Sequence, residues 1–334
     1  MKIVVFDATL WNPEPLPWTE LEALGEVQAV GTVSKDEIGR VAAEAEAVFV
    51  WRTVLNREAI RAMPRLRYVG LLDLDGSARV NLEVAAKRGI VVCRVAVSLA
   101  ESIAEHVFAV LLELARGVGL HMAAVHRREW TRVGRPCWWR FPMRRLAGLT
   151  LGLVGDGGAA ATIAGRARAF GMRALWTECG GTGPSVVIEG VEPAAPDRVL
   201  RESDVIIVLA AAAPETLGWL NRERLAAMKP GAWLVHVGGA GVVDEVALAE
   251  ALRNGPAPAL AALDRMTLEP PPPDHPLLSL RNCRITPHLA WAAAETRAAI
   301  IAAAADNLRA WMEGRAEGVL TTQSGVRPRS LEER

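Results

Sequence analysis

The stretch LTLGLVGDGGAAATIAGRARAFGMRALWTE, residues 149–178, decides the fold. An apolar run ends at Gly155, and Gly157 and Ala160 fill the second and third places of a G-x-G-x-x-G/A turn that leads directly into a helical pattern. Glycines at such a turn let a pyrophosphate approach the free N–H groups at the start of the helix. A strand, this turn and a helix together predict a dinucleotide-binding unit.

The second apolar run of this stretch is followed by Glu178, 23 residues beyond Gly155. An acid about 20 residues after the first glycine is placed to hold the adenosine ribose hydroxyls, and its charge repels a 2′-phosphate. The sequence therefore predicts NAD as the cofactor in preference to NADP. The alternative is a glycine-rich turn in a fold that binds no nucleotide, and Asp156 favours it because its charge would lie near the pyrophosphate.

Short runs rich in Val, Ile and Leu alternate with segments of helical period along the chain, which predicts an α/β fold with parallel sheets. Five strands are expected in the first part, at residues 3–6, 27–30, 47–50, 68–71 and 90–93. Six more are expected in the second part, at residues 149–154, 173–177, 205–209, 232–237, 259–263 and 283–286. One long connecting helix is expected over 100–126, and a final one over 292–313.

Composition excludes several classes of protein. The 334 residues are 51% hydrophobic and 23% charged, and 38 basic residues balance 38 acidic ones, so a field directed at nucleic acid or an anionic membrane is not expected. No apolar run reaches the roughly 20 residues of a membrane span. The opening MKIVVFDATL has the pattern of a buried strand and not of a signal peptide. Four widely spaced cysteines indicate neither a zinc site nor a disulfide framework, so a cytoplasmic location is the expectation.

Further motifs carry a resemblance to a known family: RGIVV at 88–92, SIAEHVFAVLLELAR at 102–116, APETLGWLN at 213–221, MKPGAWLV at 228–235, VVDEVALAEAL at 242–252 and HPLLSLRNCRITPHLAWA at 275–292. With the glycine turn, they make the chain similar to the D-isomer-specific 2-hydroxyacid dehydrogenases, in the neighbourhood of glycerate/hydroxypyruvate reductases and phosphoglycerate dehydrogenase.

The resemblance implies two flavodoxin-like or Rossmann-like domains with parallel sheets. A substrate domain would comprise residues 1–98 plus 288–334, and an inserted NAD-binding domain would comprise residues 99–287. It also implies an oxidoreductase that acts on a small molecule and forms a homodimer.

The resemblance assigns the catalytic residues one by one. His288, in TPHLAW, matches the family's general acid/base, and Glu269, in LEPPPP, matches the carboxylate that pairs with it. Asp264 matches the acid that reaches the nicotinamide end of the cofactor. Read without the resemblance, TPH can instead be a structural turn and EP the edge of a solvated loop.

The chain departs from the family where the substrate carboxylate is held. The family pattern N-T-x-R-G-x-x-V-D-E places its arginine where this chain has Gly239. The family's carboxylate loop keeps only Gly76 of its two glycines, and the segment that follows begins with Arg94. Arg52, Arg94 and Arg265 are candidates to replace the missing cation. Trp291, with Trp138 and Trp139, is a candidate wall for a less polar substrate.

Two functions follow as hypotheses. The first is an NAD-dependent oxidoreductase that transfers a hydride between nicotinamide and a carbonyl or alcohol substrate, with an altered substrate because the arginine is lost. The second is a catalytically silent NAD(H)-binding protein that senses redox state. The segment HRREWTRVGRPCWWR, residues 126–140, is rich in arginine and tryptophan, but the balanced charge favours an interdomain or dimer-interface loop over a nucleic-acid surface.

Overall fold

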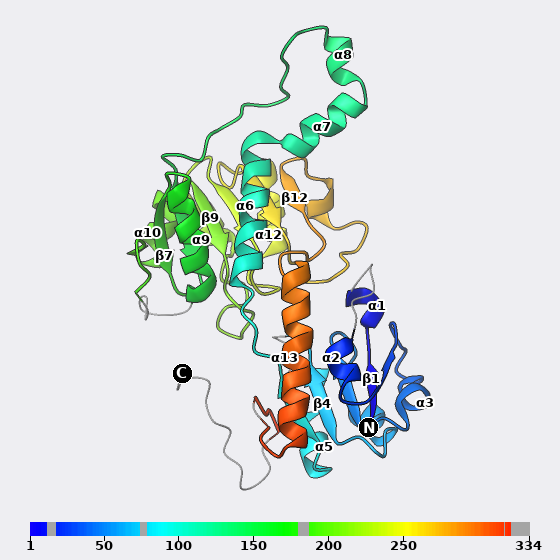
Figure 1. The fold of residues 1–334 in the computed structure, drawn as a ribbon. Coiled ribbons are helices and arrows are strands. Elements are labelled where there is room, and N and C mark those ends of the chain that lie inside the picture. Colours follow the sequence, from blue (N-terminus) through cyan, green and yellow to red (C-terminus); the bar gives the residue numbers. More distant parts are fainter. Residues whose placement is uncertain (12–17, 74–78, 180–186, 317, 322–334) are drawn as a thin grey trace. The chain divides into compact units, whose positions relative to one another are not determined.

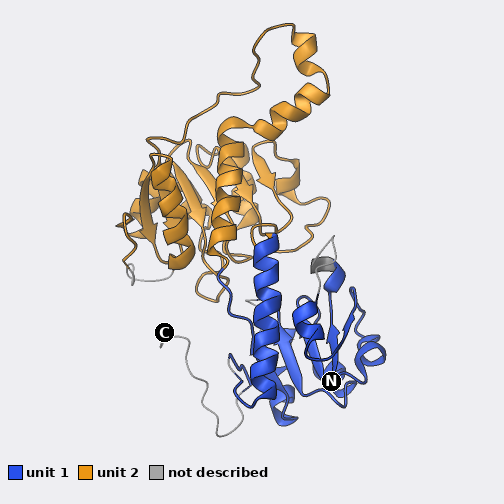
Figure 2. Ribbon diagram, in the orientation of Figure 1, with its two compact units in different colours: residues 1–98, 294–334 blue, residues 99–293 orange. Residues whose placement is uncertain are grey.

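The chain folds into two compact units (Figure 2): residues 1–98 with 294–334 form unit 1, and residues 99–293 form unit 2. The computed structural model describes residues 1–11, 18–73, 79–179, 187–316 and 318–321. The expected boundaries at 98 and 99 coincide with those of the units, but unit 2 extends past the expected end at 287 as far as Ala293. His288 therefore lies in unit 2 and not in the unit that contains the N-terminus.

Unit 1 is built on a five-stranded parallel sheet with the strand order β2-β1-β3-β4-β5. Its strands are β1 (Lys2–Val5), β2 (Glu26–Ala29), β3 (Ala47–Val50), β4 (Tyr68–Leu71) and β5 (Val91–Arg94). Its helices are α1 (Ala8–Trp11), α2 (Thr19–Glu22), α3 (Ile38–Ala42), α4 (Arg57–Arg61), α5 (Leu82–Lys87) and α13 (Ala294–Met312). On one face of this sheet the Tyr68 ring packs against Trp311 of α13, with ring centroids 5.2 Å apart.

Unit 2 is built on a seven-stranded parallel sheet with the strand order β12-β11-β10-β9-β6-β7-β8. Its strands are β6 (Thr150–Val154), β7 (Arg173–Thr177), β8 (Glu192–Pro193), β9 (Val205–Val208), β10 (Trp233–His236), β11 (Leu260–Leu263) and β12 (Cys283–Ile285). Its helices are α6 (Ala100–Arg116), α7 (Val118–His126), α8 (Glu129–Val133), α9 (Gly157–Ala169), α10 (Pro196–Glu202), α11 (Arg222–Ala226), α12 (Glu245–Asn254) and the 3-10 helix η2 (Pro276–Ser279).

Both faces of the unit 2 sheet are buried, as expected for a parallel sheet. Successive residues of a strand point to opposite faces, so Trp233 and Val235 of β10 join a core with α6 and α9, whereas Leu234 joins a core with α10, α11 and α12. The apolar runs of the sequence lack the alternation of a one-sided sheet for this reason. The carboxyl ends of β6, β7, β10 and β11 all lie at one edge of the sheet, because the strands are parallel.

Two expectations about the elements of unit 2 were wrong. The single helix expected over 100–126 is divided into α6 and α7 by Gly117, whose φ of 54° ends α6, and the two helices meet at a 61° bend. The sheet also gains the short strand β8, which the sequence conceals because it consists of a charged residue and a proline. Within the described ranges no single helix is long and apolar enough to cross a membrane. Helices α6 and α7 taken together have the length and composition of a membrane span, but they are bent by 61°.

Candidate active site

The glycine turn follows β6 directly and needs a glycine at its first position. Gly155 has a φ of 107°, and a Cβ atom there would lie 2.3 Å from the backbone N of Ala210. The Gly155 carbonyl accepts a hydrogen bond from the indole Nε1 of Trp176 at 2.9 Å, and its N–H donates to the carbonyl of Thr177. These bonds join the turn to β7, so its position is fixed by two strands.

Helix α9 begins at the second glycine of the motif. A Cβ atom on Gly157 would meet no heavy atom of the described residues closer than 3.6 Å, so these residues leave the backbone at the helix start uncovered. Ala160, at the third place of the motif, is completely buried against the sheet. Asp156 caps the helix, and its carboxylate accepts the Ala159 N–H at 2.9 Å, which occupies one of the donors that would face an anion.

Glu178 lies one residue beyond the end of β7. The β6–β7 register pairs Val154 with Thr177, so Glu178 follows a residue that is hydrogen-bonded to the glycine turn. An uncovered helix start, a glycine that no other residue can replace and an acid at the next strand end together fit a dinucleotide. Gly155 and Gly157 would lie at its pyrophosphate end, Ala160 would let α9 pack closely on the sheet, and Glu178 would hold its adenosine ribose.

A histidine–carboxylate pair lies in unit 2. His288 Nδ1 is 3.0 Å from Glu269 Oε2, and both side chains are about one-fifth exposed. A carboxylate only accepts hydrogen bonds, so His288 donates from Nδ1, and Nε2 is its other ring nitrogen. Such a pair can hold and deliver a proton while the carboxylate fixes the orientation of the ring.

Asp264 anchors the segment that carries His288. Its buried carboxylate accepts the backbone N–H groups of Leu289 and Ala290 at 2.7 and 2.8 Å, and the Thr286 hydroxyl at 2.6 Å. His288 itself has a φ of 57°, a left-handed conformation that costs free energy in a residue with a side chain. The hydrogen bonds to Asp264 on both sides of His288 hold the histidine in this conformation.

The position that lacks the family arginine is closed by backbone. A Cβ atom on Gly239 would lie 2.0 Å from the backbone N of Ala212 and 2.7 Å from the backbone of Ala211. The Gly239 N–H donates to the Ala210 carbonyl at 2.7 Å, which holds the two segments together. No side chain fits at residue 239 unless residues 210–212 move.

Arg265 lies beside the histidine–carboxylate pair. Its Nε is 3.5 Å from Glu269 Oε1, the carboxylate oxygen that His288 does not contact. Trp291 borders the same pair, with its ring centroid 6.5 Å from that of His288 in an edge-on arrangement. The structure thus brings His288, Glu269, Asp264, Arg265 and Trp291 together in unit 2.

Two further candidate substrate residues belong to the segment 1–98. Arg94 ends β5 of unit 1, where its backbone carbonyl accepts a hydrogen bond from Asn307 Nδ2 at 3.1 Å. Gly76 lies outside the described residues.

Three residues of the site were not predicted. Trp176 holds the glycine turn, and an indole among the aliphatic residues of a buried strand was the available signal. His106 Nε2 lies 3.2 Å from Thr286 Oγ1 and 3.4 Å from Asp264 Oδ1, and so supports the same anchor. His236 is buried at the end of β10, and its Nδ1 has no hydrogen-bond partner among the described residues. Burial and the nearby Arg265 guanidinium lower the pKa of His236 to about 4, so its ring is neutral at pH 7.

The chain is similar in sequence to known proteins. Residues 108–290 match the family model for the NAD binding domain of D-isomer specific 2-hydroxyacid dehydrogenases. The hydroxypyruvate reductase of Blautia hydrogenotrophica is 33% identical over 317 residues, which cover 94% of this chain and 98% of that protein.

Solved structures show the same similarity. The TT0316 protein of Thermus thermophilus is 32% identical, with a TM-score of 0.81, and the match covers 96% of this chain and all of that one. The D-lactate dehydrogenase of Aquifex aeolicus, solved with NAD and lactic acid, is 25% identical, with a TM-score of 0.77 and the same coverage. The chain therefore belongs to the D-isomer specific 2-hydroxyacid dehydrogenases and is an NAD-dependent dehydrogenase or reductase.

Proposed function

We propose that the protein transfers a hydride between nicotinamide and the carbonyl or alcohol carbon of a small substrate, with His288 as the proton donor and acceptor. NAD, when bound, supplies or receives the hydride. His288 Nε2 delivers a proton to the substrate oxygen in reduction and removes it in oxidation. The observation that carries the proposal is the 3.0 Å contact between His288 and Glu269, because it orients the ring for proton transfer.

Each remaining residue of the site has a role in this reaction. Gly155, Gly157, Ala160 and Glu178 hold the adenosine diphosphate part of the cofactor. Asp264 contacts its nicotinamide end, as in the family, and its hydrogen bonds to Leu289 and Ala290 keep His288 in place. A single carboxylate carries both roles only if binding of the cofactor redistributes these hydrogen bonds.

Recognition of the substrate differs from that of ordinary relatives. The family's arginine grips the substrate carboxylate, and removing one preorganised donor of this kind typically lowers the rate by about 10²–10³. Gly239 lacks that donor, and the backbone of Ala212 occupies the space where the Cβ atom of an arginine at this position would lie. Gly76, Arg94 and Trp291 are further substrate contacts in the proposal. Lactic acid, hydroxypyruvate and their analogues are the first compounds to try, because they belong to the named relatives.

The two units take different parts in the reaction. Unit 2 binds NAD, and unit 1 is the substrate domain. A cytoplasmic location belongs to the same proposal and is supported by four free cysteines, since secreted proteins of this size generally oxidise theirs.

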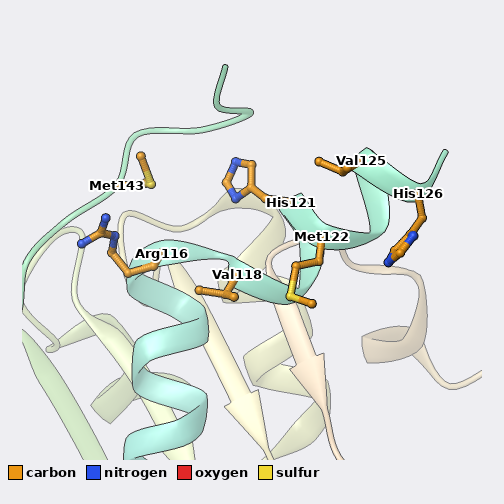
Figure 3. A pocket seen from close by; sticks show the side chains of 7 residues that line it. All are labelled: Arg116, Val118, His121, Met122, Val125, His126 and Met143. Atoms are coloured by element: carbon orange, nitrogen blue, oxygen red, sulfur yellow. The ribbon is translucent and has the colours of Figure 1, made fainter. Parts of the chain in front are cut away.

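A homodimer is also part of the proposal. Helices α7 and α8 project from the unit 2 sheet (Figure 1), and α7 exposes Val118, Met122 and Val125, with Met122 58% exposed. These side chains line a cavity of about 620 Å³ together with Arg116, His121, His126 and Met143 (Figure 3). An exposed apolar surface of this kind is typical of a protein interface.

Steady-state kinetics of wild type and His288→Ala test the reaction. With NADH and hydroxypyruvate, the wild type should turn over and His288→Ala should lose at least 10²-fold in kcat. NADH binding by calorimetry should be the same in both proteins. Full activity in His288→Ala would refute the role of the histidine, and a wild type that binds NADH without turnover on any 2-oxo acid or uncharged ketone would be a silent NAD-binding protein.

A further inference from the structure

Glu269, the carboxylate that orients His288, lies in a long irregular segment of unit 2. Residues 264–275, between the end of β11 and the start of η2, form neither a helix nor a strand. Around Glu269 the side chains of Thr267, Leu268 and Pro270 are exposed, so burial in a core does not hold this part of the chain. Hydrogen bonds to a neighbouring element are needed to fix its position.

Glu245, the first residue of α12, contacts this segment on both sides of Glu269. Its Oε1 accepts the Thr267 N–H at 2.5 Å and the Thr267 hydroxyl at 2.8 Å. Its Oε2 lies 3.0 Å from His275 Nε2. Thr267 precedes Glu269 by two residues, and His275 follows it by six. One carboxylate thus ties both flanks of Glu269 to the same helix.

The hydrogen bonds of His275 determine which ring nitrogen carries the proton. Its Nδ1 accepts the Leu277 N–H at 3.4 Å, at the start of η2. Nε2 therefore carries the proton and donates it to Glu245, because a carboxylate only accepts. The side chains of Glu245 and His275 are 10% and 13% exposed, so water competes little for this hydrogen bond.

A helix-capping role does not account for the position of Glu245. An acid in the first turn of a helix is favourable beside the free N–H groups there. Helix α12 is already capped by Asp244, whose carboxylate accepts the Ala247 N–H at 2.9 Å. Both carboxylate oxygens of Glu245 face the segment 264–275 instead.

We propose that Glu245 is a positioning residue of the reaction. Through Thr267 and His275 it holds the segment 264–275, and so keeps the Glu269 carboxylate where it orients the His288 ring. A group that takes part in catalysis must be held within about 0.5 Å of its productive geometry, so the loss of this support lowers the rate. The inference rests on the proposed function, because it takes His288 as the proton donor and acceptor.

The test compares Glu245→Ala, which removes both contacts, with Glu250→Ala. Glu250 lies on the same helix and pairs with Arg222 at the surface, so its variant controls for the loss of one negative charge from α12. Glu245→Gln is a milder second variant. Its amide has one oxygen in place of two, so it can accept from Thr267 or from His275 but not from both.

The first readout is the mobility of the segment, and it needs no turnover. Hydrogen–deuterium exchange is measured for a peptide that covers residues 265–269, where the Thr267 N–H now donates to Glu245. We expect exchange at the Thr267 amide to be at least tenfold faster in Glu245→Ala than in the wild type, and unchanged in Glu250→Ala.

The second readout is kinetic, with NADH and hydroxypyruvate. Glu245→Ala should lower kcat by about 10–10²-fold, since a misplacement of about 1 Å can have an effect of this size. Glu245→Gln should have an intermediate kcat, and Glu250→Ala should match the wild type. The affinity for NADH should stay unchanged in all three variants.

A double-mutant cycle shows whether Glu245 acts through Glu269. When Glu269→Ala is already present, adding Glu245→Ala should change kcat by less than twofold, because the group that Glu245 positions is gone. A general loss of folded structure would instead lower kcat by the same factor with and without Glu269.

Each other outcome overturns a specific claim. Unchanged exchange or an unchanged kcat in Glu245→Ala would overturn the role of Glu245 and leave the dehydrogenase intact. Equal losses of kcat with and without Glu269 would overturn the action through that carboxylate. Faster exchange in Glu245→Ala, with a wild type that turns over no 2-oxo acid or uncharged ketone, would overturn the proposed function and retain the hold of Glu245 on the segment.

Discussion

Replacing Gly239 with alanine adds one methyl group where the backbone of residues 210–212 already lies. The new Cβ would be 2.0 Å from the Ala212 N, whereas real Cβ atoms stay beyond 3.0 Å, so the segment must move by about 1 Å. Overpacking of this kind typically costs about 1–3 kcal/mol. The Gly239 hydrogen bond to Ala210, at 2.7 Å, would be strained as well, which adds about 1 kcal/mol.

The free energy of unfolding should therefore fall by roughly 2–4 kcal/mol, which lowers the Tm of a unit of this size by about 5–15 °C. Gly239→Arg should be destabilised at least as much and should gain no reduction of 2-oxo acids. Gly165→Ala is the matched control: it lies inside α9 with no described residue within 4 Å of its Cβ, so the Tm should stay unchanged or rise. Differential scanning calorimetry of the wild type and the three variants measures these changes in Tm. A Gly239→Ala protein as stable as wild type, or a Gly239→Arg protein with restored activity, would refute the closure of this position.

Four further variants test other parts of the site. The wild type should bind NAD at least tenfold more tightly than NADP. Glu178→Gln should reduce this ratio of affinities, because the substitution removes the charge that repels a 2′-phosphate. Equal affinities of the wild type for the two cofactors would contradict the assignment of Glu178 to the adenosine ribose. Asp156→Asn keeps the helix cap but removes a charge near the pyrophosphate, so calorimetry should show severalfold tighter NAD binding. Glu269→Gln should lower kcat, because the neutral amide holds the His288 ring less firmly than the carboxylate that now lies 3.0 Å from its Nδ1. The pKa of His236 is about 4 in the folded state, so its ring stays neutral there at pH 5. The unfolded chain takes up the proton between pH 7 and pH 5, so the free energy of unfolding of the wild type should fall by about 2 kcal/mol over this range. His236→Asn should lack this part of the loss when denaturant titrations at pH 7 and pH 5 are compared.

The sequence was sufficient to predict elements whose signal lies within a short stretch of the chain. Gly155, the N-terminus of α9 and Glu178 lie on two consecutive strands and the helix between them, so their spacing along the chain fixes their spacing in the fold. The helical period, by contrast, continues through Gly117 without interruption. The break there depends on a left-handed backbone and on the Phe141 ring, which would lie 2.1 Å from a Cβ at this position, and such a contact between distant residues leaves no periodic signal.

The departure at Gly239 shows where sequence comparison stops. Alignment with the family revealed that the arginine is missing, and it named Arg265 as a candidate replacement. It did not reveal that residues 210–212 fill the position, because that contact joins the ends of β9 and β10 through space. The same limit applies to Asp264, whose hydrogen bonds to Leu289 and Ala290 span 25 and 26 residues.

The most direct test of the account is a crystal structure of the protein with NADH and oxamate. The account predicts that the amide oxygen of oxamate, an unreactive analogue of a 2-oxo acid, faces His288 Nε2 next to the nicotinamide ring. Oxamate bound with none of its oxygen atoms facing His288 would contradict it.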